Sequence, residues 1–240
     1  MQFLTNLEVQ NHEIADILFL QALFGMSIML VLSPFLGGIQ SLWIKEKLKW
    51  HFARAFMFAI NTAGSLFALS MLPMVDAYTI FFLSPFIVCL LSILLFKEHI
   101  GINRWLAMLG GFSGVLVAFR PGFQDINIAH LVAILCSFTF AFTHIFARIA
   151  GRSSTKLSFG FWPLFVIALC SFLYQGGNIN YGDTNFLISC SLMGFFYGSA
   201  LIAIAYSFTL ADASIVSPFQ YTQLIFALAF GYLIFGDIPD

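Results

Sequence analysis

The stretch IADILFLQALFGMSIMLVLSPFL, residues 14–36, decides the fold class of this chain. It contains a single charged residue, Asp16, and is as long as the roughly 20 apolar residues that a helix needs to cross a bilayer. Seven stretches of the same character follow it. The expected spans are residues 14–36, 52–74, 77–96, 104–120, 129–150, 158–175, 186–209 and 213–235.

The composition of the whole chain agrees with a membrane location. Hydrophobic residues make up 60% and charged residues 9%, with a mean hydropathy of +0.95, whereas an average soluble domain has about 25% charged residues. Membrane lipid is therefore the expected surroundings of most of the surface. Because lipid cannot satisfy backbone amides, and because the runs are continuous rather than alternating, we expect an all-α integral membrane protein, a multi-pass helical bundle.

The cationic residues predict how the bundle is oriented. If consecutive loops lie on opposite faces, nine of the ten Lys and Arg residues lie on one face: Lys45, Lys47, Lys49, Arg54, Lys97, Arg104, Arg148, Arg152 and Lys156. The other face has only Arg120. Since Lys and Arg collect in cytoplasmic loops, the first face is predicted to be cytoplasmic, and both ends of this chain to lie outside.

An internal duplication runs through the chain. Ala68-Leu69-Ser70 followed by Val75-Asp76-Ala77 recurs as Ala205-Tyr206-Ser207 followed by Ala211-Asp212-Ala213, and Leu95-Phe96-Lys97-Glu98 recurs as Ile234-Phe235-Gly236-Asp237. Each copy is expected to contain a helix, a tight turn at the Asp-Ala pair, and a second helix interrupted by a proline, Pro85 or Pro218. Shifting the spans by this period predicts a ten-span parent with five spans per repeat, the second inverted relative to the first. Residues 1–122 would then be a first repeat lacking its first helix, and residues 123–240 a second repeat lacking its last helix.

These landmarks resemble the drug/metabolite transporter superfamily, EamA type. The resemblance rests on Leu72-Pro73-Met74-Val75-Asp76-Ala77-Tyr78, Leu83-Ser84-Pro85-Phe86 and Phe96-Lys97-Glu98, and on Ala211-Asp212-Ala213-Ser214, Ser217-Pro218-Phe219-Gln220-Tyr221-Thr222-Gln223 and Phe235-Gly236-Asp237. It implies two inverted five-helix repeats, a central cavity and alternating access without ATP. The expected function is secondary-active transport of a small organic metabolite, such as an amino acid, amine or nucleoside-like compound, across a bacterial inner membrane. A proton or other ion would be coupled to it, or a second substrate exchanged. The alternatives are a non-transporting fragment of such a transporter and, more remotely, a membrane enzyme.

Polar residues at membrane depth are the candidates for a substrate path, because they are costly unless they face a cavity or the bundle interior. The candidates are Asn61, Tyr78, Thr79, Ser84, His144, Tyr206, Gln220, Tyr221 and Gln223. The tyrosines would stack on a planar or cationic substrate. Pro85 and Pro218 are candidate hinges, with static kinks as the alternative. For the amides, the alternative is hydrogen bonding between helices.

His144 and Arg148 lie four residues apart and share one helix face. They predict a contact with an anionic group or a protonatable step in coupling. Alternatively, Arg148 extends to the cytoplasmic interface while His144 hydrogen-bonds a neighbour. Asp16, near the start of its span, is interpreted as an interfacial residue.

Small residues and missing motifs complete the predictions. Gly110-x-x-x-Gly114 and Gly194-x-x-x-Gly198 favour close approach of helices within the molecule. The sequence contains no H-E-x-x-H, phosphate-binding glycine loop or G-x-S-x-G motif. Its acidic residues are assigned to separate loops: Asp76, Glu98, Asp125, Asp183, Asp212 and Asp237. We therefore expect no enzyme, no cofactor, no metal site and no nucleic-acid partner, and leave the oligomeric state open.

Overall fold

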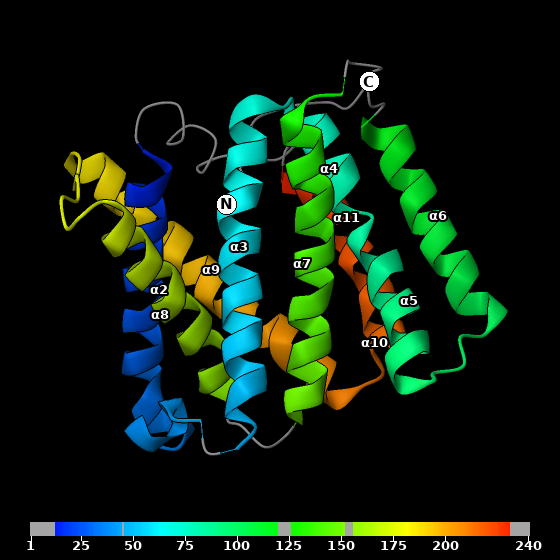
Figure 1. Cartoon of the computed structure of the whole chain (residues 1–240), viewed down its shortest axis with the longest axis horizontal. Helices are drawn as coiled ribbons and strands as arrows, with labels where there is room; N and C mark the ends of the chain where they lie inside the picture. The colour runs from blue at the N-terminus through cyan, green and yellow to red at the C-terminus, as the bar shows by residue number, and fades with distance from the viewer. Residues whose placement is uncertain (1–12, 45, 120–125, 152–155, 231–240) are drawn as a thin grey trace.

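A computed structural model of the 240-residue chain describes residues 13–44, 46–119, 126–151 and 156–230. Over these residues the secondary structure is entirely helical, and eight segments run side by side between two faces (Figure 1). Six segments are long and apolar enough to cross a membrane: Ile14–Leu36, Leu48–Met71, Asp76–Phe96, Ile128–Ala150, Leu157–Tyr174 and Thr184–Leu210. The protein is therefore a multi-pass helical membrane protein, as predicted.

The helices follow the predicted spans closely. They are α2 (Ile14–Leu32), η1 (Ser33–Leu36), η2 (Ile39–Leu42), α3 (Leu48–Met71), α4 (Met74–Phe81), α5 (Ser84–Phe96), α6 (Ile102–Phe119), α7 (Ile128–Ala150), α8 (Lys156–Tyr174), α9 (Thr184–Leu210), α10 (Ala213–Val216), η4 (Ser217–Tyr221) and α11 (Thr222–Phe230). Several predicted features lie outside the described residues: the end of the last span, the landmark Ile234-Phe235-Gly236-Asp237, and Lys45, Arg120, Asp125 and Arg152.

Two spans are interrupted where the sequence has a proline. The third is divided into α4 and α5 at residues 82–83, and Pro85 lies in the first turn of α5, where its missing amide proton breaks no helical bond. The last span passes from α10 through η4, which contains Pro218, into α11. Both predicted interruptions are therefore present.

The predicted turn at Asp-Ala is wrong in the first copy. There the chain turns at Leu72 and Pro73, and Asp76 already lies in the first turn of α4. Pro73 forces Leu72 into an extended conformation, with φ −110° and ψ 149°, which ends α3 three residues earlier than the prediction. In the second copy the turn is where it was predicted, with Asp212 as the N-cap of α10.

Helices from the two halves of the chain interlock. α2 packs between α8 and α9, while α3 and α5 pack against α7. Glycines allow the closest approach: a Cβ atom on Gly194 would lie 2.7 Å from the Gln21 carbonyl oxygen, and one on Gly198 would lie 3.3 Å from the Gly25 Cα. The prediction of intramolecular packing is thus confirmed for Gly194-x-x-x-Gly198. The second predicted pair, Gly110-x-x-x-Gly114, has a different outcome: a Cβ on either glycine would meet no atom of the described residues within 4 Å.

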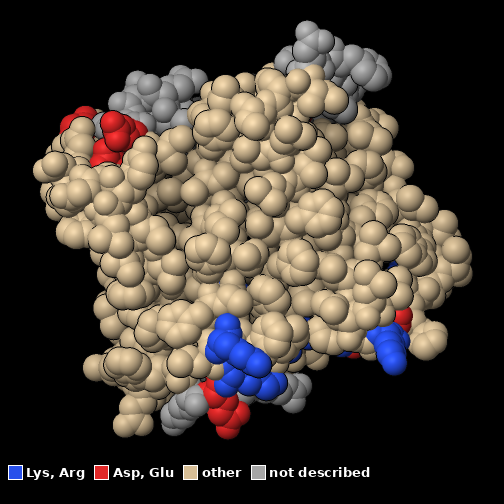
Figure 2. Space-filling model, in the orientation of Figure 1, with Lys and Arg blue, Asp and Glu red and all other residues tan. Residues whose placement is uncertain are grey.

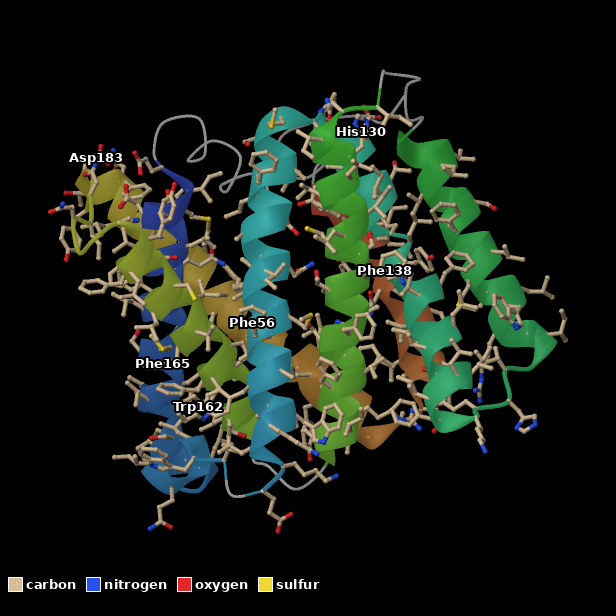
Figure 3. The ribbon with its side chains drawn as sticks, in the orientation of Figure 1. Phe56, His130, Phe138, Trp162, Phe165 and Asp183 are labelled. Carbon is tan, nitrogen blue, oxygen red and sulfur yellow. The ribbon has the colours of Figure 1, made fainter. Side chains whose placement is uncertain are left out.

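The charged side chains visible on the face in Figure 2 lie at the two edges of the molecule. In Figure 2 the Lys and Arg side chains gather along the lower edge, where α3 begins and α7 ends, and a broad uncharged band lies above them. Phe56, Phe138 and Phe165, labelled in Figure 3, are exposed within that band. This distribution agrees with the predicted orientation, in which the cation-rich lower face is cytoplasmic.

Polar side chains cap helices at the upper edge. Asp183 accepts a hydrogen bond from the Phe186 amide at 2.8 Å at the start of α9, and Asn127 caps α7 together with His130. Asp183 and His130 are labelled at this edge in Figure 3. Asp16 lies near it as well, at the start of α2, and accepts from the Asn180 amide at 3.0 Å, as an interfacial residue would.

Candidate functional site

Asn61, the predicted polar residue of α3, and Thr62 beside it contact two different neighbouring helices. Asn61 is buried and donates from Nδ2 to the Cys136 carbonyl of α7 at 2.8 Å. Thr62, the next residue, is hydrogen-bonded to the Tyr197 hydroxyl of α9 at 3.0 Å, and the Phe58 and Tyr197 rings lie 5.7 Å apart. Asn61 thus makes the interhelical bond that was the alternative interpretation, and the aromatic surface next to α3 comes from Phe58 and Tyr197.

Tyr221 ties the two interrupted spans together. Its hydroxyl donates to the Phe82 carbonyl at 3.0 Å, and the two rings are stacked with centroids 5.7 Å apart. The amide of Phe86 donates to the Leu83 carbonyl, so the Tyr221 hydroxyl occupies a position that a regular helix fills with a backbone amide. A Cβ atom on Gly111 would lie 2.5 Å from the Tyr221 ring, so only glycine fits there. Tyr221 therefore stabilises the break next to Pro85.

The remaining path candidates are placed differently. Thr79 and Ser84 are buried beside the same break, and Tyr78 is half-buried, edge-on to the Phe81 ring at 5.6 Å. Tyr206 and Gln220 are also half-buried, whereas Gln223 is exposed on α11. The structure thus gathers the candidates of the third span around the break and leaves Gln223 on the outer surface of the described bundle.

His144 lies in an aromatic site near the lower end of α7. Its ring is stacked on Phe208 at 4.3 Å and meets Phe140 edge-on at 4.4 Å, and its side chain is buried. Neither ring nitrogen has a hydrogen-bond partner among the described residues. The alternative prediction, a hydrogen bond to a neighbour, is therefore wrong. Because α7 presents this face to α9, the ring meets aromatic side chains instead.

Arg148 joins two carboxylates that the sequence analysis assigned to separate loops. Its guanidinium contacts Glu98 at 2.5 Å and Asp212 at 3.0 Å and lies 4.7 Å above the centre of the Phe96 ring. Glu98 follows α5 and Asp212 precedes α10, so the two halves of the chain meet here. The prediction of dispersed acidic residues is wrong at these positions, because α5, α7 and α9 all end at the same face and bring both carboxylates to Arg148. We call Glu98, Arg148 and Asp212 the ion-pair cluster.

Arg54 is the functional candidate that the sequence analysis missed. Its side chain is 1% exposed and donates from Nη1 to the Phe159 carbonyl at 2.5 Å. Pro163 lies four residues after Phe159 within α8, so that carbonyl has no amide partner from the helix. The predicted span began at residue 52, which put Arg54 at the interface. The sequence offered one signal for this contact: an arginine near the start of one helix, Arg54, and a proline inside another, Pro163.

The model of the EamA-like transporter family matches residues 3–120 and again residues 127–240. The chain belongs to this family. The resemblance to EamA-type proteins that the sequence analysis stated is therefore confirmed.

The relatives of this EamA-like chain have two different names. The S-adenosylmethionine uptake transporter of Rickettsia bellii is 26% identical over 194 residues, which are 79% of this chain and 65% of that protein. The riboflavin transporter of Vibrio cholerae is 27% identical over 224 residues, which are 90% of this chain and 74% of that protein. The chain thus spans slightly less than two thirds of the length of the first of these relatives.

The fold has also been seen in a crystal structure. One protein of known crystal structure matches 100% of this chain and 85% of its own, with a TM-score of 0.81 and 16% sequence identity. At this identity the match establishes the fold of the bundle and carries no information on substrate.

Proposed function

We propose that this chain transports a small organic metabolite across a bacterial inner membrane by alternating access of two inverted repeats, divided near residue 122. The observation that carries the proposal is the match of one family model to both halves of the chain. The interlocked packing supports it, because α3 and α5 of the first half lie against α7 of the second. Relative movement of the halves would therefore rearrange the centre of the bundle.

The substrate class is narrowed by what the relatives' names have in common. S-adenosylmethionine and riboflavin each carry a planar heteroaromatic ring system on a polar chain. Aromatic side chains pair where the halves meet, Phe58 with Tyr197 and Phe82 with Tyr221, and separation of these pairs would expose flat faces for such a ring. We therefore favour a nucleoside-like or flavin-like metabolite over a simple amino acid or amine.

The ion-pair cluster is the proposed closure of the cation-rich face. It joins the end of α5, the last turn of α7 and the start of α10, and the Glu98 carboxylate also accepts from the Ser214 amide at 3.3 Å. Access from that face would require these contacts to separate. On this proposal the structure is closed toward the cytoplasm.

Uptake into proteoliposomes tests the function. Purified protein would be reconstituted and offered radiolabelled S-adenosylmethionine, riboflavin, amino acids and amines, with protein-free liposomes as the control. Saturable uptake of a heteroaromatic compound supports the proposal. Uptake of amino acids alone contradicts the substrate class. If this chain moves none of them but a version extended by one helix at each end does, it is the non-transporting fragment that the sequence analysis kept as an alternative.

A further inference from the structure

Two basic side chains from different halves of the chain lie at the same depth in the bundle. Arg54 is six residues after the start of α3, and His144 is six residues before the end of the antiparallel α7. Each is therefore about 9 Å from the cation-rich face. Both side chains are almost completely buried. Phe159, whose carbonyl accepts the Arg54 bond, packs with Ala147, three residues after His144 on α7, so both basic groups adjoin the same cluster. α3 and α7 pack along their length, so this juxtaposition is part of the main contact between the halves.

The guanidinium of Arg54 has unused hydrogen-bonding capacity. Its Nη1 donates to Phe159, but Nε and Nη2 have no partner among the described residues. The ion pairs found in this part of the chain involve Arg148, not Arg54. His51, a second buried basic group, lies three residues earlier on α3. A charge buried without a partner costs several kcal/mol, so a site that lacks an anion of its own favours one that arrives from outside.

We propose that Arg54 and His144 bind the oxyanion group, carboxylate or phosphate, of the transported metabolite. This inference rests on the proposed function and specifies in addition that the substrate carries a negatively charged group. The free Nε and Nη2 edge of a guanidinium matches the two oxygens of such a group, which a neutral ligand does not supply. Arg148, one turn nearer the face than His144, is neutralised by Glu98 and Asp212, so Arg54 is the cation left for the ligand.

Binding of two matched pairs of compounds tests the proposal. S-adenosylmethionine differs from decarboxylated S-adenosylmethionine by a carboxylate, and riboflavin 5′-phosphate differs from riboflavin by a phosphate. Affinities would be measured by calorimetry on the purified chain, on Arg54→Gln, and on Lys49→Gln, which removes an exposed cation of the same helix.

In at least one pair, the anionic member is expected to bind ten-fold or more tightly. Arg54→Gln should reduce that ratio to below three-fold, and Lys49→Gln should leave it unchanged. The pair that shows the effect identifies carboxylate or phosphate as the group. Equal binding within both pairs, or a preference that survives in Arg54→Gln, would overturn the proposal.

A second measurement distinguishes failure of the proposed anion site from failure of the proposed function. If none of the four compounds binds, the proposed substrate class has failed, and the thermal midpoints of ligand-free Arg54→Met and Arg148→Met decide about the site. Arg148→Met should lower the midpoint, because it leaves two carboxylates unpaired. Arg54→Met should lower it less than Arg148→Met does, because the lost bond to the Phe159 carbonyl is offset by removal of a buried charge that has no anionic partner. A loss with Arg54→Met as large as that with Arg148→Met would show that the guanidinium only ties α3 to α8, and the proposal would be wrong.

Discussion

Replacing Gly194 by alanine should loosen the contact between α2 and α9. The new Cβ would lie 2.7 Å from the Gln21 carbonyl oxygen and 2.9 Å from the Gly25 amide nitrogen, and ordinary contact begins at 3.4 Å. Both neighbours are backbone atoms that cannot rotate away, so the helices must separate by roughly 0.7 Å at the crossing. Overpacking of this kind costs about 1–3 kcal/mol, against a gain of up to about 1 kcal/mol from the helix propensity of alanine.

Gly110→Ala is the matched control within the same protein. It also lies inside an apolar helix, but its Cβ would meet nothing within 4 Å among the described residues. Both substitutions gain the helix propensity of alanine, but only Gly194→Ala creates a clash. Gly194→Ala should therefore be less stable than Gly110→Ala by about 1–3 kcal/mol. Unfolding by SDS, followed by the fluorescence of the four tryptophans, would measure the difference. Equal stability of the two variants would refute the close approach of α2 and α9.

Three further variants test the contacts between the halves. Tyr221→Phe removes the hydroxyl that bonds the Phe82 carbonyl and should lower the unfolding free energy by about 1–2 kcal/mol, measured by the same SDS titration; an unchanged value would mean that water replaces the hydroxyl at no cost. Arg148→Ala and Glu98→Ala should be non-additive, with a coupling energy of about 1–3 kcal/mol in a double-mutant cycle on the thermal midpoint, whereas additive effects would show that the pair is not formed. Gln223→Leu should leave stability within about 0.5 kcal/mol and leave uptake in proteoliposomes unchanged, because this side chain is exposed on α11; a selective loss of uptake would return it to the substrate path.

The spans were predictable because the cost of placing a residue in lipid is local and can be summed along the sequence. The break before Ser84 was also predictable, since Pro85 removes an amide donor wherever it lies. The turn at Leu72 and Pro73 was not predicted, although Pro73 is itself a sequence signal for the end of a helix. Interpreting Asp76 as the turn residue by analogy with Asp212 overlooked the proline that precedes only the first of them.

The contacts of the candidate site were harder to predict from the sequence than the spans were. Glu98 and Asp212 are far apart in the chain, and only the packing of α5, α7 and α9 brings both to Arg148. Arg54 was placed at the interface because its span was started four residues too late. Its partner, the Phe159 carbonyl, is revealed by the geometry of α8 rather than by a motif. Long-range polar contacts of this kind depend on which helix faces meet, which hydropathy does not specify.

The hydrogen bond between Tyr221 and Phe82 would couple separation of α11 from α5 to the entry of water. If α11 moved away from α5, the Phe82 carbonyl would lose this donor at a depth where lipid offers no substitute. An unpaired carbonyl in a dry environment costs several kcal/mol, and a water molecule removes most of that cost. Separation of the halves at this point and the arrival of water must therefore occur together. If the chain works by the proposed alternating access, water must enter this gap as it opens, and hydration becomes part of the transition itself.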